Sequence, residues 1–185
     1  MSRLVLFLFL IPLCRGQGEQ EMMLNFDSDI EVCDDEDSQA FMDTKGIKTD
    51  RNETVAFVTG SIEFFKGMGA NTMVEIKVFK VENGRSEMVF SYEICDLCAE
   101  IMDPESDYKK YLQYFGFPEV CPFAPGNYKI HDLTADTSEL PINPANAGRY
   151  RIILTIFEDS DGSCKSDRTF LCCSQLEALI EPAGT

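Results

Sequence analysis

Apolar and polar residues alternate along much of the chain, a pattern typical of strands that bury one face. The expected strands cover residues 24–32, 55–59, 73–79, 88–92, 128–133, 150–157 and 169–180. Val55 and Phe57 are expected on one face of the second strand, and Phe170 with Cys172 on one face of the last. Many short strands separated by turn residues predict an all-β fold, either an antiparallel sandwich or an open barrel.

Two segments depart from this alternation. Asn83-Gly84 lies between the strands 73–79 and 88–92, and Asn-Gly is a strong signal for a β-hairpin turn. Between Tyr92 and Tyr114 the apolar residues recur every three to four positions, which predicts a short helix broken by Pro104. This is the single helical segment that the pattern predicts.

The N-terminus has the organisation of a secretory signal peptide. Arg3 precedes an apolar run from Leu4 to Cys14, and Gly16 is the expected cleavage position. Residues 1–16 are therefore expected to be removed, and residues 17–185 to form one secreted domain. No later stretch has the roughly 20 apolar residues of a membrane helix, so stable membrane insertion is not expected.

The cysteines and the net charge narrow the class of protein further. Loss of Cys14 with the leader leaves seven of the eight cysteines, and an oxidising compartment would pair them with one left over. Loss of Arg3 and Arg15 would change the formal net charge of −16 to −18. Such an acidic surface repels nucleic acid and anionic membranes, so neither is an expected partner.

The sequence gives no support for catalysis or for a cofactor. It has one histidine, His131, which is expected to be structural or exposed, and it has neither a nucleophile elbow nor a phosphate loop. Cys95 and Cys98 have the spacing of redox and zinc sites, but structural disulfides fit better without a βαβ pattern or a second ligand pair. The acidic run 34–37 lacks the ligand spacing of a calcium loop.

Several blocks in sequence order resemble the ganglioside activator protein family and the wider ML-like lipid-recognition group. The most similar block is residues 114–128, which reads YFGFPEVCPFAPGNY. Further similar blocks are Asn25-Phe26-Asp27, Asn52-Glu53-Thr54, residues 98–103 and Gly148-Arg149-Tyr150. Secreted insect proteins related to the activator, some proposed to act in chemosensation, share this pattern. Together the blocks cover roughly residues 24–180.

The resemblance implies a β-sandwich opened into a lipid-binding cup, with a short helix at its rim. The residues that it places on the cavity wall or rim are Ile101, Met102, Tyr111, Tyr114, Phe115, Phe117 and Phe123. An ordinary packed core is the alternative interpretation of these aromatic side chains. The loop 82–86 is polar here, whereas activators carry apolar residues at that place, and a polar tip would insert poorly into a bilayer.

The resemblance also implies a disulfide between Cys98 and Cys121. A second bridge, from Cys33 to Cys172, is expected to join the first and last strands. Cys172 and Cys173 are adjacent on one strand and point to opposite faces, so only one of them can easily reach Cys33. The pairing of Cys95, Cys164 and Cys173 is left open. Asn52, in the acceptor sequence Asn52-Glu53-Thr54, is the expected glycosylation site.

The sequence therefore predicts a secreted, non-enzymatic carrier of a lipid or other hydrophobic small molecule. Chemosensation, with a pheromone-type ligand, is the preferred biological setting. One alternative is an activator in the lysosomal lumen that presents glycolipid to a hydrolase. The other is a secreted module with a filled core that binds a receptor or another protein. An apolar cavity of several hundred cubic ångströms would distinguish the carrier from this module.

Overall fold

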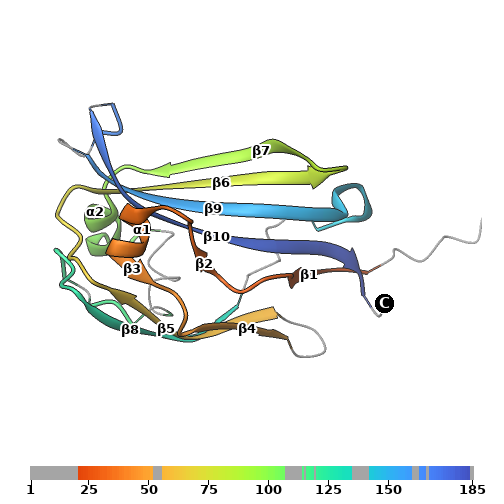
Figure 1. The fold of residues 1–185 in the computed structure, drawn as a ribbon, viewed down its shortest axis with the longest axis horizontal. Helices are drawn as coiled ribbons and strands as arrows, with labels where there is room; N and C mark the ends of the chain where they lie inside the picture. The colour runs from red at the N-terminus through yellow and green to blue at the C-terminus, as the bar shows by residue number, and fades with distance from the viewer. Residues whose placement is uncertain are drawn as a thin grey trace, which may run out of the picture.

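The fold is antiparallel β in two layers, as the alternation predicts. A computed structural model describes residues 21–51, 56–106, 114, 116–118, 120–134, 142–159, 163–165 and 167–183. Within these residues the strands form a six-stranded and a four-stranded sheet. The two sheets lie one above the other in Figure 1, and the helices α1 and α2 lie together at one end. No helix among the described residues is long and apolar enough to cross a membrane.

The larger sheet has the strand order β1-β10-β9-β6-β7, with β2 also paired to β10. Its strands are β1 (Met22–Phe26), β2 (Glu31–Val32), β6 (Thr72–Glu82), β7 (Arg85–Ile94), β9 (Gly148–Asp159) and β10 (Arg168–Pro182). The predicted hairpin joins β6 to β7. Asn83 and Gly84 have φ angles of 51° and 74°, the left-handed values that a two-residue type I′ turn requires.

The smaller sheet forms around β5. Its strands are β3 (Met42–Asp43), β4 (Ile47–Arg51), β5 (Ala56–Phe64) and β8 (Gly126–Thr134). β5 pairs with all three of the others. In β5 the buried side chains are Ala56, Val58 and Phe64, whereas Phe57 is half-buried, so the side that carries Phe57 is not the more buried one. Val55 lies outside the described residues.

The helical prediction is confirmed in part. α2 (Leu97–Met102) begins at Asp96, whose carboxylate accepts a hydrogen bond from the Ala99 N–H. A second helix, α1 (Glu36–Phe41), was not predicted. Asp35 caps it by accepting hydrogen bonds from the Ser38 N–H and hydroxyl, so part of the acidic run 34–37 forms the start of a helix. A short 3₁₀ turn, η2, covers Pro144–Asn146.

Two of the predicted strands are less regular than the alternation suggests. The strand expected at residues 24–32 is interrupted between β1 and β2, where Asp29 accepts hydrogen bonds from the N–H and hydroxyl of Thr49. In β10 the register shifts between Phe170 and Cys172. Phe170 therefore lies opposite Phe157, on the other face from Cys172, and the prediction that they share a face is wrong.

Three disulfides connect distant parts of the chain. Cys98 joins Cys121, the pair that the resemblance implied, and Cys95 joins Cys164. Cys33 joins Cys173, so the expected Cys33–Cys172 bridge is wrong. The register of β2 against β10 explains why Cys33 pairs with Cys173. Val32 lies opposite Ser174, so the next residue, Cys33, lies opposite Cys173. Directly opposed residues share a face, and Cys172 points to the other one.

The tightest packing lies at the end that carries α1 and α2. Side chains from both sheets and from α2 meet there with exposures of 5% or less. They are Phe41, Met42, Phe64, Met68, Ile101, Phe123, Ile156 and Cys172. A smaller cluster of Ile47, Val58 and Ile130 lies in the four-stranded sheet. The Cys98–Cys121 bridge fixes α2 to the segment that carries Phe123, and so closes this end of the sandwich.

Candidate functional site

One face of the larger sheet is apolar along most of its length. Alternate residues of neighbouring strands share this face because Ile76 pairs with Leu154, Leu154 with Ser174, and Val78 with Ile152. Ile156 and Cys172, which belong to the closed core, lie on the same side. We call this side the inner face. Its apolar members in the middle of the sheet are Ile76, Val78, Ile152, Leu154 and Leu176.

Burial along the inner face decreases away from the helices on β6 and β9, whereas Ala178 of β10, opposite Tyr150, is 1% exposed. Ile156 and Cys172 are 5% and 0% exposed. Ile76, Val78 and Ile152, further along the same strands, are only half-buried. A two-layer sandwich with a filled core would bury such positions as fully as the first two. The inner face therefore leaves apolar surface uncovered towards the hairpin end of β6 and β7.

The edge strand β7 extends this apolar surface. Its register with β6 sets Phe90 opposite Val78 and Tyr92 opposite Ile76, so both rings are on the inner face. Phe90 is 53% exposed and Tyr92 40%, and their rings are nearly parallel with centroids 6.4 Å apart. Large exposed aromatic side chains that adjoin other apolar surface are typical of a binding surface.

The residues expected on the cavity wall or rim fall into three groups. Ile101 and Phe123 are 4% and 2% exposed in the closed core, and the half-buried Phe117 packs against the Phe123 ring at 5.0 Å. Met102 is 64% exposed, and Tyr114 is half-buried. Tyr111 and Phe115 lie outside the described residues, as does Asn52. A role of this set in ligand binding stays a prediction, and Ile101 and Phe123 have the burial of structural core residues.

The inner-face residues of β6, β7 and β9 were not among the expected site residues, although the sequence contains their signal. In 74–78 the apolar residues Val74, Ile76 and Val78 alternate with the charged residues Glu75 and Lys77. That alternation defines an apolar side, but it does not say whether a second layer covers it. Only the pairing of the strands and the exposure of each side chain identify a surface that remains open.

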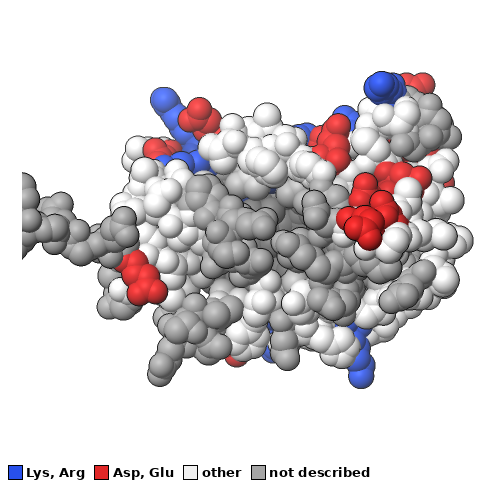
Figure 2. All heavy atoms as spheres, turned by 180° about the vertical axis from the view of Figure 1, so that it is seen from behind, with Lys and Arg blue, Asp and Glu red and all other residues white. Residues whose placement is uncertain are grey.

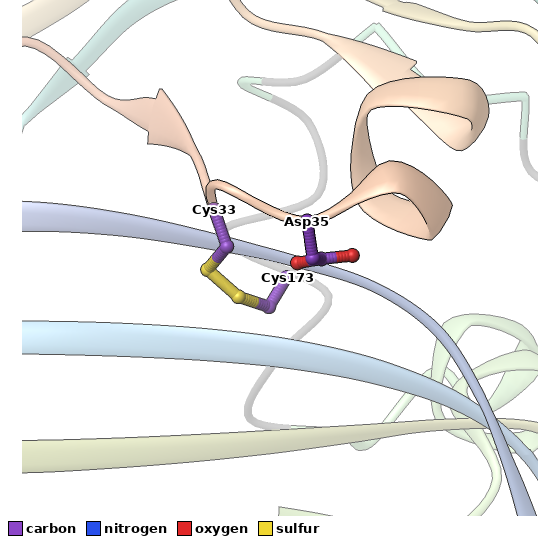
Figure 3. Close-up of side chains that lie close together, drawn as sticks. All are labelled: Cys33, Asp35 and Cys173. Carbon is purple, nitrogen blue, oxygen red and sulfur yellow. A yellow bond between two sulfur atoms is a disulfide. The ribbon is translucent and has the colours of Figure 1, made fainter.

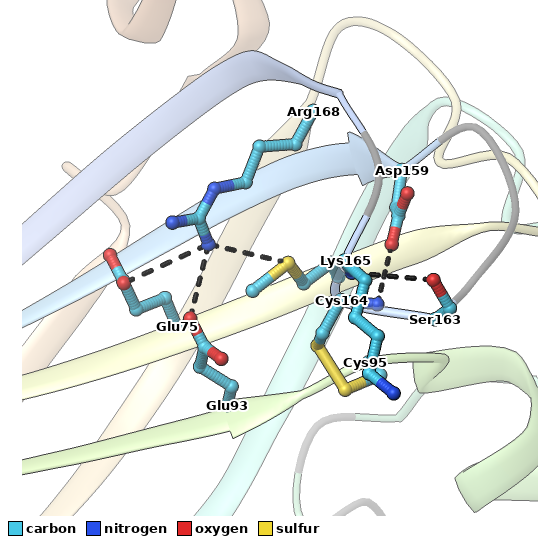
Figure 4. Close-up of a disulfide and its surroundings, with 9 residues drawn as sticks. Glu75, Glu93, Cys95, Asp159, Ser163, Cys164, Lys165 and Arg168 are labelled. Carbon is cyan, nitrogen blue, oxygen red and sulfur yellow. Dashed lines mark hydrogen bonds and ion pairs between the residues drawn. A yellow bond between two sulfur atoms is a disulfide. The ribbon is translucent and has the colours of Figure 1, made fainter.

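The opposite face of the larger sheet carries a network of charged side chains around Arg168. Its guanidinium lies 3.1 Å from the Glu93 carboxylate and 3.9 Å from that of Glu75 (Figure 4). It also lies 4.8 Å from the centre of the Phe157 ring. The Cys95–Cys164 bridge lies beside it and joins the end of β7 to the segment before β10. Because Cys95 and Cys98 have different partners, they do not form a redox pair.

Cys172 is the one unpaired thiol among the described residues, and its surroundings do not suit a nucleophile. Cys172 is fully buried, with its Sγ 3.9 Å from the sulfur of Met42. Burial, with a smaller contribution from the charge of Asp35, raises the pKa of the thiol to about 12. Since the thiolate is the reactive form, Cys172 is inert at neutral pH. It behaves as a small apolar core residue.

A cluster of Cys33, Asp35 and Cys173 has metal-ligand atoms close together, yet it does not fit a metal ion (Figure 3). Both sulfurs are joined in a disulfide and carry no thiolate. The two oxygens of Asp35 accept hydrogen bonds from Ser38. The cluster is explained by the helix cap and the bridge.

The described acidic and basic side chains on the back of the molecule lie mostly towards its margins (Figure 2). Two half-open clefts adjoin charged residues elsewhere. One of about 310 Å³ is lined by residues of β1, β4 and β10, among them Asp27, Asp50 and Glu181. The other, of about 430 Å³, lies at the β6–β7 hairpin.

Residues 74–152 match a family described as a protein of unknown function (DUF1091). The matched segment begins in β6, ends in β9 and contains the Cys98–Cys121 bridge. No curated protein matches the chain.

Proposed function

We propose that the protein is a secreted, non-enzymatic carrier that binds a lipid or other hydrophobic ligand against the inner face. The observation that supports this most is the set of half-buried apolar side chains in the middle of a two-layer fold. Each ligand methylene buried there gains about 0.8 kcal/mol, so an acyl chain would bind well with few polar contacts. The closed core at the helical end would form the floor of the cup.

Two further observations agree with this proposal. Three disulfides among the described cysteines fit an oxidising, extracellular compartment. The segment that matches DUF1091 contains the whole 114–128 block, which carries the resemblance to ML-like lipid-recognition domains. A cup of that type is the architecture that the inner face and its uncovered end support. A pheromone-type ligand in chemosensation is the setting that the resemblance favours.

The proposal favours carriage through fluid over presentation of glycolipid to a hydrolase. The tip of the β6–β7 hairpin is polar and exposed at Glu82, Asn83, Gly84 and Arg85. A tip of this kind has no apolar side chain to insert into a bilayer, so extraction of lipid from a membrane would need another surface.

A protein-binding module is the second candidate, and the exposure of β7 supports it. Every residue from Arg85 to Glu93 is exposed, and the apolar side chains of Met88 and Val89 are about half exposed. An edge strand of this length is a template for pairing with another chain. The register shift opposite Val78 and Phe79 makes the edge irregular, which disfavours such pairing.

Uptake of a fluorescent fatty-acid analogue distinguishes these two candidates. We expect the folded protein to bind the analogue at micromolar concentration, with a blue-shifted emission that an excess of unlabelled fatty acid reverses. The shift reports transfer of the probe from water to an apolar site. A folded protein that leaves the emission unchanged at these concentrations would favour the protein-binding module.

A further inference from the structure

A polar cleft borders the inner face where the β6–β7 hairpin turns. It has a volume of about 430 Å³ and is lined by Lys80, Glu82, Asn83, Arg85 and Glu87. The register pairs Lys80 with Glu87 and Glu82 with Arg85, so each pair shares one side of the hairpin.

That side is the inner face. Lys80 is two residues from Val78 on β6 and lies opposite Tyr150 of β9, just as Val78 lies opposite Ile152. Alternate residues of a strand point the same way, so the apolar row of Ile76 and Val78 continues directly into the charged cleft. An elongated ligand on the inner face would reach this cleft with one end.

Among the four charged residues of the cleft, one close ion pair forms, and the charge of Glu87 also acts on Lys80 from the opposite strand. The Lys80 ammonium lies 2.8 Å from the Glu82 carboxylate, and this hydrogen bond raises the pKa of Lys80. Among the described residues, neither Arg85 nor Glu87 forms an ion pair within 4.0 Å. Residues two apart on a strand are separated by about 7 Å. Arg85 and Glu87 therefore offer one cation and one anion within the span of a single head group.

We propose that this cleft binds the head group of an amphipathic ligand, and that the head group is zwitterionic. The proposal rests on the proposed function, because it requires the ligand's acyl chain on the inner face. The anionic group would meet the Arg85 guanidinium, and the cationic group would meet the Glu87 carboxylate. A singly charged head group gains one of these contacts and is repelled by the other residue.

The test compares three probes with identical dodecyl-length chains, each below its critical micelle concentration. They are lauroyl lysophosphatidylcholine, laurate and dodecyltrimethylammonium. We expect the zwitterionic probe to bind the wild type about threefold to tenfold more tightly than the other two, as expected for partly exposed charge pairs. Displacement of a fluorescent acyl probe gives all three dissociation constants in one assay.

The variants Arg85→Gln and Glu87→Gln test the assignment of each charge. Arg85→Gln should weaken binding of the zwitterion and strengthen that of the cationic probe, because a repulsive charge is removed. Glu87→Gln should weaken binding of the zwitterion and strengthen that of laurate. Lys45→Gln, at a lysine whose side chain is 91% exposed in the turn between β3 and β4, is the control and should change none of the three.

The outcomes separate the two proposals. If the three probes bind the wild type equally, or if both variants leave the order of affinities unchanged, the head-group site is wrong and the apolar cup stands. If no probe binds the folded wild type, the cup itself is wrong, and the head-group site with it.

Discussion

Replacing Phe123 by alanine should destabilise the fold by about 3–5 kcal/mol, the usual cost of truncating a fully buried phenylalanine. Phe123 is 2% exposed, and its ring packs against Phe117 at the end closed by the Cys98–Cys121 bridge. The backbone N–H and C=O of Phe123 also exchange hydrogen bonds with those of Met68. These bonds hold the backbone in place, so the site cannot collapse to fill the space of the lost ring. Chemical unfolding with the disulfides intact measures this change in free energy.

Met102→Ala is the control for this substitution, because Met102 belongs to the same expected rim set but is 64% exposed. Its effect should stay within about 0.5 kcal/mol. A loss of less than about 1 kcal/mol for Phe123→Ala, with reduced uptake of an acyl probe, would instead place Phe123 on the wall of the cavity.

Replacing Ile152 by aspartate should remove acyl-probe binding while the protein stays folded. Ile152 is half-buried on the inner face between Val78 and Leu176. A carboxylate there would lose its water when an acyl chain covers it, and that desolvation costs several kcal/mol. The dissociation constant should therefore rise by about a hundredfold or more.

Ile153→Asp is a matched control, because Ile153 is the next residue of β9, is also half-buried, and points to the opposite face. Both variants place the same charge in the same strand, so their effects on folding should be similar. Their effects on probe binding should differ. Equal loss of binding in both variants, at equal stability, would contradict a site on the inner face.

The sequence predicts most strands because their alternation reports which residues are half-buried, and it predicts the β6–β7 turn because Asn and Gly tolerate the positive φ angles that a type I′ turn requires. It does not predict the side that each residue faces where pairing is irregular. In β10 a register shift places Phe170 with Phe157 rather than with Cys172. The same dependence on register explains why Cys33 pairs with Cys173.

The sequence does not single out the inner face, for a physical reason. The aromatic residues near the Cys98–Cys121 bridge stand out in the sequence, yet Phe123 is held in a packed core. The alternation in β7 and β9 is similar, but β7 is an edge strand and β9 lies between β6 and β10. Strand order and distance from the helical end together decide that Phe90 and Tyr92 are exposed while Ile156 is buried. A local pattern carries no information about strand order.

The most direct test of lipid binding is native mass spectrometry of the protein purified from secreting cells. We expect a noncovalent adduct in the mass range of a single-chain or double-chain lipid, lost on denaturation and absent from Ile152→Asp but retained by Ile153→Asp. A folded wild type that carries no adduct, and acquires none after incubation with acyl lipids, would contradict the carrier function.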